Sequence, residues 1–211
     1  MTDAPSVTTF VVGDRLPWPD EGPPLDGKGP FDVGAIHHSG TRLECAIRKI
    51  SAFGVTVASN LAPALGDSVA IELANGQRAS GRVAWTSRQE LGIRFDDSVD
   101  VMALLNRKLV SQTPERRTMP RLEMRSAVHL KFSGQLWPAT LRNISSQGIQ
   151  IEGEALPALG TFVSVLVQGL SVPAGEVVWR RDKLAGIELL EELSWSSIIP
   201  WVRGMLRQAP S

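Results

Sequence analysis

The residues best suited to chemistry lie in a basic stretch, Arg107–Lys131, near the middle of the chain. Seven basic and two acidic side chains give this stretch a local excess of positive charge, although the whole chain is formally neutral. Most of the basic residues are arginines, whose planar guanidinium matches phosphate oxygens and the guanine O6/N7 edge, whereas Lys offers only a point charge. Pro114 and Pro120 restrict the backbone around them. The stretch therefore predicts an anion site, with a solvated linker as the alternative.

The elements that must position these arginines belong to an internal repeat. KISAFGVTV (49–57) resembles NISSQGIQI (143–151), PALG recurs, GRVAW (81–85) resembles GEVVW (175–179), and LGIRF resembles AGIEL. All four pairs are separated by the same offset of 94 residues, without a gap. This period is too long for a solenoid, so the chain is expected to contain two copies of one small domain.

Within each copy, apolar residues alternate with the period of a β-strand. Val69, Ile71 and Leu73 precede an Asn75-Gly76 dipeptide, which is typical of a hairpin turn. Several short strands with regular turn signals predict a small barrel. We therefore predict an all-β fold of two six-stranded antiparallel barrels in tandem, each closed by a short C-terminal helix.

Helical spacing follows each predicted barrel, over residues 97–112 and 192–208. Pro200 is expected to kink or restart the second helix, because proline lacks the backbone N–H. Trp85 and Trp179 occupy equivalent strand positions and are expected to pack in the two cores.

Two motifs in the second copy resemble those of a known family. Arg117 and Arg121 form an RxxxR motif, and Asn143 to Gly148 (NISSQG) forms a (D/N)xSxxG motif. In this order, on a strand-rich frame that ends in a helix, they resemble the PilZ domain, a bacterial receptor for the second messenger cyclic di-GMP. The resemblance covers residues from about 115 to 208, and the repeat extends it in degenerate form to residues 35–112. It implies a receptor that needs no metal or cofactor.

The resemblance also implies which residues bind the ligand: Arg116, Arg117, Arg121, Asn143, Ser145 and Gly148. Arg117 and Arg121, on a loop over the barrel mouth, would pair with phosphates or a guanine edge. Asn143 offers a donor and an acceptor, and Ser145 adds a hydroxyl. Gly148 permits a positive φ or a close approach of the ligand. In this family, an arginine at the place of Arg116 accompanies an intercalated pair of ligand molecules.

The first copy departs from this pattern. Lys49 stands where Asn143 stands, and no RxxxR motif precedes it, whereas Ile50, Ser51 and Gly54 persist. The persisting residues are therefore expected to serve the turn and the barrel in both copies, while the arginines and Asn143 serve the ligand. The first barrel is expected not to bind the nucleotide.

The remaining sequence predicts the organisation and compartment of the chain. Residues 1–34 are rich in Pro and Gly, with six acidic and two basic side chains, and are expected to form a flexible acidic tail. Residues 35–112 and 113–208 are the expected domains. Cys45 is the single cysteine, and neither a signal peptide nor an apolar membrane span is apparent, which favours a cytoplasmic protein without membrane insertion.

The sequence suggests functions of three different classes. The first is a cyclic di-GMP effector in which ligand capture by the second barrel orders the arginine loop 113–122 and alters domain packing or the binding of an unidentified protein partner. The second is a protein-interaction adaptor that binds no nucleotide. A binder of nucleic-acid polymers is disfavoured, because it needs exposed aromatic residues along a basic groove. GxSxG, P-loop and HExxH motifs are absent from the sequence, so an enzyme is not expected.

Overall fold

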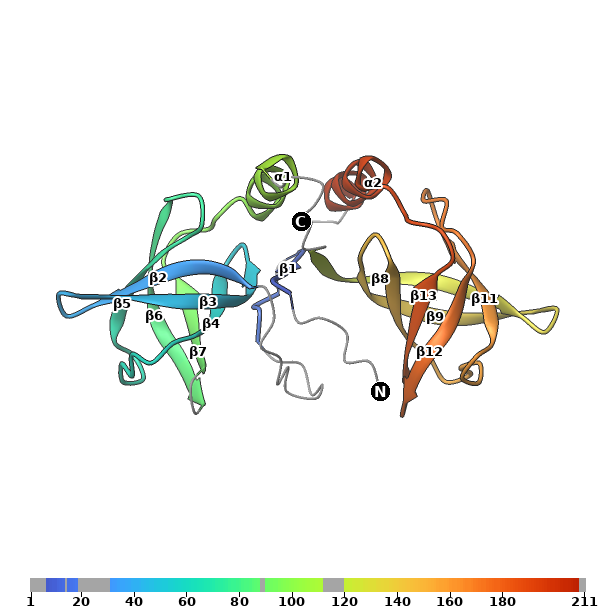
Figure 1. Cartoon of the computed structure of the whole chain (residues 1–211), viewed down its shortest axis with the longest axis horizontal. Helices are drawn as coiled ribbons and strands as arrows, with labels where there is room; N and C mark the ends of the chain where they lie inside the picture. Colours follow the sequence, from blue (N-terminus) through green and yellow to red (C-terminus); the bar gives the residue numbers. More distant parts are fainter. Residues whose placement is uncertain (1–6, 14, 19–30, 88–89, 112–119, 209–211) are drawn as a thin grey trace. The chain divides into compact units, whose positions relative to one another are not determined.

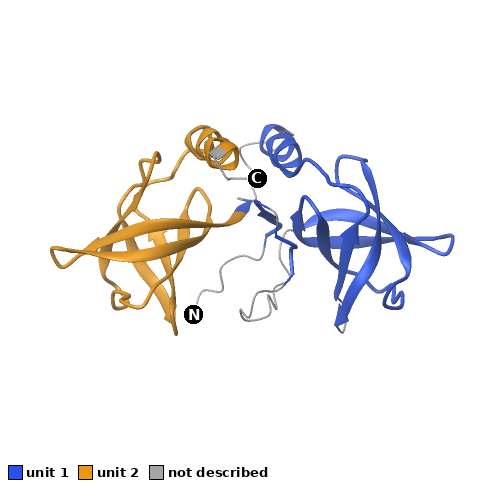
Figure 2. Ribbon diagram, turned by 180° about the vertical axis from the view of Figure 1, so that it is seen from behind, with its two compact units in different colours: residues 1–121 blue, residues 122–211 orange. Residues whose placement is uncertain are grey.

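The computed structural model describes residues 7–13, 15–18, 31–87, 90–111 and 120–208 (Figure 1). The chain divides into two compact units, residues 1–121 and 122–211 (Figure 2). Each unit contains a closed six-stranded antiparallel barrel followed by one helix. The predicted all-β fold of tandem barrels is therefore confirmed.

Barrel 1 closes in the strand order β3-β2-β5-β6-β7-β4, with β4 returning to β3. The side chains of Ile36, Ile71 and Ile93 fill its interior and are fully buried. Its elements are β2 (Asp32–His38), β3 (Thr41–Ser51), β4 (Gly54–Ala58), β5 (Ser68–Glu72), β6 (Arg78–Ser87), β7 (Glu90–Phe95) and α1 (Val101–Ser111).

Barrel 2 closes in the equivalent order, β9-β8-β11-β12-β13-β10, with β10 returning to β9. Leu141, Ile151 and Ile187 fill its interior. Its elements are β8 (Arg121–Phe132), β9 (Gln135–Ile144), β10 (Gly148–Glu152), β11 (Phe162–Val167), β12 (Gly175–Arg181), β13 (Leu184–Leu189) and α2 (Trp195–Gln208). Helix α2 continues through Pro200 and does not restart there.

The repeat extends to the irregularities of the strands. In β6 the pairing with β7 shifts between Val83 and Trp85, and in β12 the pairing with β13 shifts between Val177 and Trp179. A β-bulge of this kind inserts one residue and reverses the inside-outside alternation. Trp85 and Trp179 therefore lie on the outer faces, and 39% of Trp179 is exposed. The expectation that both pack in the cores was wrong.

Part of the expected flexible tail is a strand of unit 1. β1 (Thr9–Val11) pairs in parallel with β3, with Thr9 opposite Lys49 and Phe10 opposite Ile50. Residues 7–12 are buried, and β2 already begins at Asp32. The expectation therefore does not hold for residues 7–13, 15–18 and 31–34, and residues 1–6, 14 and 19–30 lie outside the described residues.

A partly buried ion pair ties helix α1 to the barrel and to β1. Lys108 Nζ lies 2.6 Å from Asp32 Oδ1 and 5.9 Å from the centroid of the Phe10 ring, and the lysine is only 9% exposed. Barrel 2 has Ser126 and Val202 at the equivalent positions, 94 residues later. The charge pair of barrel 1 therefore has no counterpart in barrel 2, where these two positions hold a serine and a buried valine.

We predict that Lys108→Val lowers the free energy of unfolding of unit 1 by about 2–3 kcal/mol, because it strands the partly buried Asp32 carboxylate. Adding Asp32→Ser gives barrel 1 the same two residue types that barrel 2 has at these positions, and is expected to restore most of the lost free energy of unfolding. Urea unfolding of the two variants and the wild type measures both effects. A single variant as stable as the wild type would contradict the prediction.

A second charge cluster lies on the outside of barrel 1. Glu72 accepts hydrogen bonds from Arg42, His37 and Arg78 at 3.2, 3.1 and 3.4 Å. Arg42, and then His37, lower the pKa of Glu72 from 4.5 to about 2. His37 and His38 are the last two residues of β2, and His38 lies 3.3 Å from Asp67.

This lowered pKa predicts an acid dependence of stability. Because the carboxylate of Glu72 is favoured in the folded state, its contribution is present above pH about 4.5 and is lost as the pH falls toward 2. Glu72→Gln has no titrating group at this position. We therefore expect the wild type to lose its stability advantage over Glu72→Gln across this window, as measured by thermal unfolding at pH 6, 4 and 2.5. An advantage that does not change with pH would contradict the assignment.

Candidate functional site

One row of residues crosses the outer face of barrel 2, with each member directly opposite the next on the neighbouring strand. Glu123 of β8 faces Asn143 of β9, Asn143 faces Gln150 of β10, Gln150 faces Gly186 of β13, and Gly186 faces Trp179 of β12. Residues directly opposite each other share a face of the sheet. The row therefore brings together side chains that are far apart in the sequence.

The alternation of the strands fixes the outward direction of the row. Asn143 and Gln150 are half-buried, whereas their neighbours Ile144, Ile149 and Ile151 are buried in the core. A second bulge, between Gln150 and Ile151 in the β9–β10 pairing, lies beside the row. Asn143 Nδ2 donates a hydrogen bond to Gln150 Oε1. Within the described part of the chain, Asn143 Oδ1 accepts no hydrogen bond, so an acceptor stands ready for a ligand donor.

The row ends at an indole that lies flat across a glycine. A Cβ atom added to Gly186 would lie 2.0 Å from Trp179 Nε1, so only glycine leaves room for the ring. Because Trp179 is substantially exposed, the row ends at a flat apolar surface. Sequence reasoning missed both Gln150 and this use of Trp179. The signal was the recurrence of a tryptophan and a later glycine in both copies, Trp85 with Gly92 and Trp179 with Gly186.

Arg121 places a positive charge on this face, two residues before Glu123 of the row. It is the first residue of β8, and its neighbour Leu122 is buried opposite Ile144, so the register places Arg121 opposite Ser145. Burial lowers the pKa of the Arg121 guanidinium, which remains charged at neutral pH. Arg121 has no acidic partner among the residues that the structure describes. A partly desolvated cation of this kind is suited to an anionic ligand.

The other two predicted arginines, Arg116 and Arg117, lie outside the described residues. Their place relative to the row therefore stays a prediction.

Ser145 and Gly148 make their observed contacts within the barrel. The Ser145 N–H donates to Gly148 O at 2.9 Å, and the Gly148 N–H donates to the Ser145 hydroxyl at 3.2 Å, which closes the turn between β9 and β10. Gly148 does not have a positive φ, and an added Cβ would lie 3.1 Å from Ile187 O. Ser51 and Gly54 form the same kind of turn in barrel 1. This matches the turn role expected of both positions.

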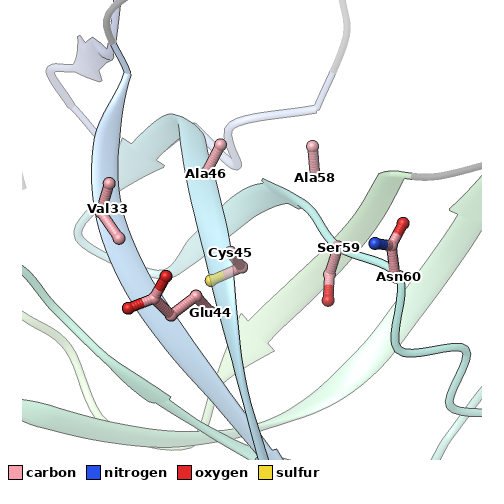
Figure 3. Close-up of a pocket in the computed structure, with 7 residues that line it drawn as sticks. All are labelled: Val33, Glu44, Cys45, Ala46, Ala58, Ser59 and Asn60. Atoms are coloured by element: carbon pink, nitrogen blue, oxygen red, sulfur yellow. The ribbon is translucent and has the colours of Figure 1, made fainter.

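A hollow of about 300 Å³ lies elsewhere, on barrel 1, beside Glu44, Cys45, Ser59 and Asn60 (Figure 3). Burial raises the pKa of the Cys45 thiol to about 11, so the thiol is not activated as a nucleophile. The described ranges contain no cluster of three or more His, Cys, Asp or Glu side chains that could hold a metal ion. Within the same ranges, neither helix has the length and apolar character needed to cross a membrane.

The PilZ domain profile matches residues 33–111 and 115–198. No curated protein matches the chain. Similar solved structures include PlzA of Borreliella burgdorferi in complex with c-di-GMP (11% identity over 82% of this chain and 86% of that chain, TM-score 0.34). A second is the inhibitor of motility MotI/DgrA of Bacillus subtilis (10% identity over 85% of this chain and 98% of that chain, TM-score 0.31). A third is YcgR of Escherichia coli in complex with c-di-GMP (10% identity over 83% of this chain and 82% of that chain, TM-score 0.27).

The two glycines beneath the indoles give a matched pair of variants. We predict that Gly92→Ala lowers the free energy of unfolding by about 1–3 kcal/mol, because Trp85 is held against Trp18, with ring centroids 6.1 Å apart, and must be displaced. Gly186→Ala is expected to have a smaller effect, because the exposed Trp179 can rotate into solvent. Urea unfolding of both variants tests the difference. Equal losses, or a larger loss for Gly186→Ala, would contradict it.

Proposed function

The chain belongs to the PilZ domain family, which matches it once in each barrel, and on this premise we propose that it is a cyclic di-GMP receptor whose second barrel captures the ligand. The observation that carries this proposal is Arg121, a partly buried cation without an acidic partner among the described residues, placed beside the row that contains Asn143. The equivalent face of barrel 1 has Lys49 in place of Asn143.

The chemistry of the row suits this ligand. Cyclic di-GMP has two negative phosphates and two flat guanines. Arg121 pairs with a phosphate or with the O6/N7 edge of a guanine, and Asn143 Oδ1 accepts a hydrogen bond from a base N–H. The exposed indole of Trp179 offers a stacking surface. Charge-assisted hydrogen bonds contribute about 1.5–3 kcal/mol each, so a few of them reach the ~8 kcal/mol of a micromolar affinity.

Arg116 and Arg117 complete the site in this proposal. Arg117 is the first arginine of the RxxxR motif and grips the ligand together with Arg121. Arg116 stacks on an additional guanine face, so that two intercalated ligand molecules bind per chain.

Ligand binding also provides the output. When the phosphates neutralise the arginines, the loop that carries Arg116 and Arg117, ahead of Arg121 in β8, becomes ordered over the face, and the packing of the two barrels or the binding of a protein partner changes. The ligand is an intracellular messenger, and the single cysteine fits a reduced compartment, so we place the protein in the cytoplasm. Neither metal nor catalysis enters this scheme.

One observation favours a protein-interaction adaptor as the second candidate. Leu136, Phe162 and Leu166 of barrel 2 are 58%, 61% and 47% exposed. The equivalent residues of barrel 1 are all polar, namely Arg42, Ser68 and Glu72. Exposed apolar side chains of this kind suit a protein partner, whether or not nucleotide binds.

Calorimetric titration with cyclic di-GMP tests the receptor proposal. We expect micromolar or tighter binding by the wild type, at least a tenfold loss in Arg121→Ala and Asn143→Ala, and a loss in Arg117→Ala. The ratio is expected to be two ligands per chain, and Arg116→Ala is expected to reduce it to one.

Lys49→Ala provides the matched control, because it changes the barrel 1 counterpart of Asn143 and is expected to leave the affinity unchanged. Absence of binding by the wild type would contradict the receptor function and leave the adaptor as the better account. A loss in Lys49→Ala as large as in Asn143→Ala would contradict the assignment to barrel 2.

A further inference from the structure

Barrel 1 has the same row across its outer face, but part of it comes from the N-terminal segment, defined here as residues 7–13 and 15–18. Thr9 of β1 faces Lys49, Lys49 faces Thr56, Thr56 faces Gly92, and Gly92 faces Trp85. In barrel 2 the first place of the row is taken by Glu123 of β8. β1 therefore occupies, beside β3, the position that the start of β8 occupies beside β9 in barrel 2.

The first half of the N-terminal segment is bound by specific contacts. The Thr8 hydroxyl donates to Ile47 O at 2.8 Å and accepts from the Asp32 N–H at 2.7 Å, which places it between β2 and β3. Phe10 and Val11 are buried, and Thr8 is fully buried. The surroundings of Thr8 thus satisfy both the donor and the acceptor of its buried hydroxyl, so barrel 1 has a specific site for this residue.

The second half of the N-terminal segment crosses the row itself. The Thr56 hydroxyl donates to Pro17 O at 2.7 Å, and Pro17 is buried. The ring of Trp18 meets that of Trp85 in a T-shaped arrangement, with centroids 6.1 Å apart. Pro17 also lies over Gly54, since a Cβ atom added there would lie 3.4 Å from Pro17 Cδ.

The equivalent positions of barrel 2 have no such cover from the described residues. Gln150 takes the place of Thr56 and bonds to Asn143, and Trp179 takes the place of Trp85 and is exposed. The same face therefore occurs twice in the chain, once covered by an extended segment of the chain itself and once open at its tryptophan.

We propose that the N-terminal segment is the built-in ligand of barrel 1. Its strand β1 adds to β3 by main-chain pairing, and Pro17 and Trp18 provide side-chain recognition, which is how sheet edges bind extended peptides. Barrel 1 is thus a peptide-binding domain whose peptide is supplied in cis, and this occupant, together with Lys49, leaves barrel 2 alone to bind the nucleotide. The statement that barrel 2 alone binds the nucleotide rests on the proposed function, whereas the peptide binding does not.

Cutting the link between the segment and the barrel tests this proposal in the full chain. A specific protease site is introduced between residues 23 and 27, the folded protein is cleaved without nucleotide, and the N-terminal fragment is followed by size-exclusion chromatography and mass spectrometry. We expect the fragment to co-elute with the body of the protein. Immediate loss of the wild-type fragment would overturn the proposal.

Two variants make the test specific. Trp18→Ala lies on the released fragment, so it leaves the body of the protein unchanged, and Thr56→Val removes the hydroxyl that binds Pro17. Each is expected to speed release of the fragment, and the two together at least tenfold. Trp179→Ala, which changes the barrel 2 counterpart of Trp85, is expected to retain the fragment as the wild type does. Equal retention in all the variants would overturn the proposal.

Hydrogen exchange of the uncut wild type gives an independent measurement. The amides of residues 8–11 are expected to be protected at least tenfold relative to an unstructured peptide. Exchange at the unstructured rate would overturn the proposal. Neither readout involves cyclic di-GMP, so failure of nucleotide binding would leave this result standing, and failure here would leave the receptor proposal standing.

Discussion

The paired β-bulges of each barrel are the constraint on which the rest of the structure depends. A strand alternates its side chains with a period of two, so one inserted residue reverses every side chain that follows it. In barrel 2 the β9–β10 bulge lies between Leu141, which faces the core, and Asn143, which faces outward, and the β12–β13 bulge turns Trp179 outward. Without these insertions, the amide and the indole would not lie on one face.

The same constraint gives the chain two equivalent faces with different surroundings. Each has a tryptophan across a glycine, but barrel 1 has Lys49 and buries Trp85 further beneath Trp18, whereas barrel 2 has Asn143 and the partly desolvated Arg121. Duplication of a fold therefore need not duplicate its ligand. A covered face adds apolar burial and hydrogen bonds to its own barrel, while a face with an exposed indole and a cation that has no acidic partner among the described residues favours an external anion.

Most of the fold could be predicted from the sequence, because a repeat without gaps and strand-like alternation constrain an antiparallel barrel strongly. The outward tryptophans could not, since Trp85 lies two residues after Val83 and a bulge between them leaves no trace in the periodicity. β1 was missed because the Pro-rich and Gly-rich composition of residues 1–34 masks a short apolar run at Phe10–Val12. Within the predicted site, Asn143 lies in one row with Gln150 and Trp179 because strands that are distant in the sequence pair with one another. The local sequence pattern contains no information about this pairing.

The central claim is that two equivalent faces hold different occupants, the N-terminal segment on barrel 1 and a nucleotide on barrel 2. Amide and indole chemical shifts from NMR, followed during titration with cyclic di-GMP, test it most directly, because each row reports separately in one sample. The account predicts shifts at Asn143, Gln150, Gly186 and the Trp179 indole, with Lys49, Thr56, Gly92 and the Trp85 indole unchanged at the row of barrel 1. Shifts confined to the barrel 1 row, or shifts of similar size in both rows, would contradict it.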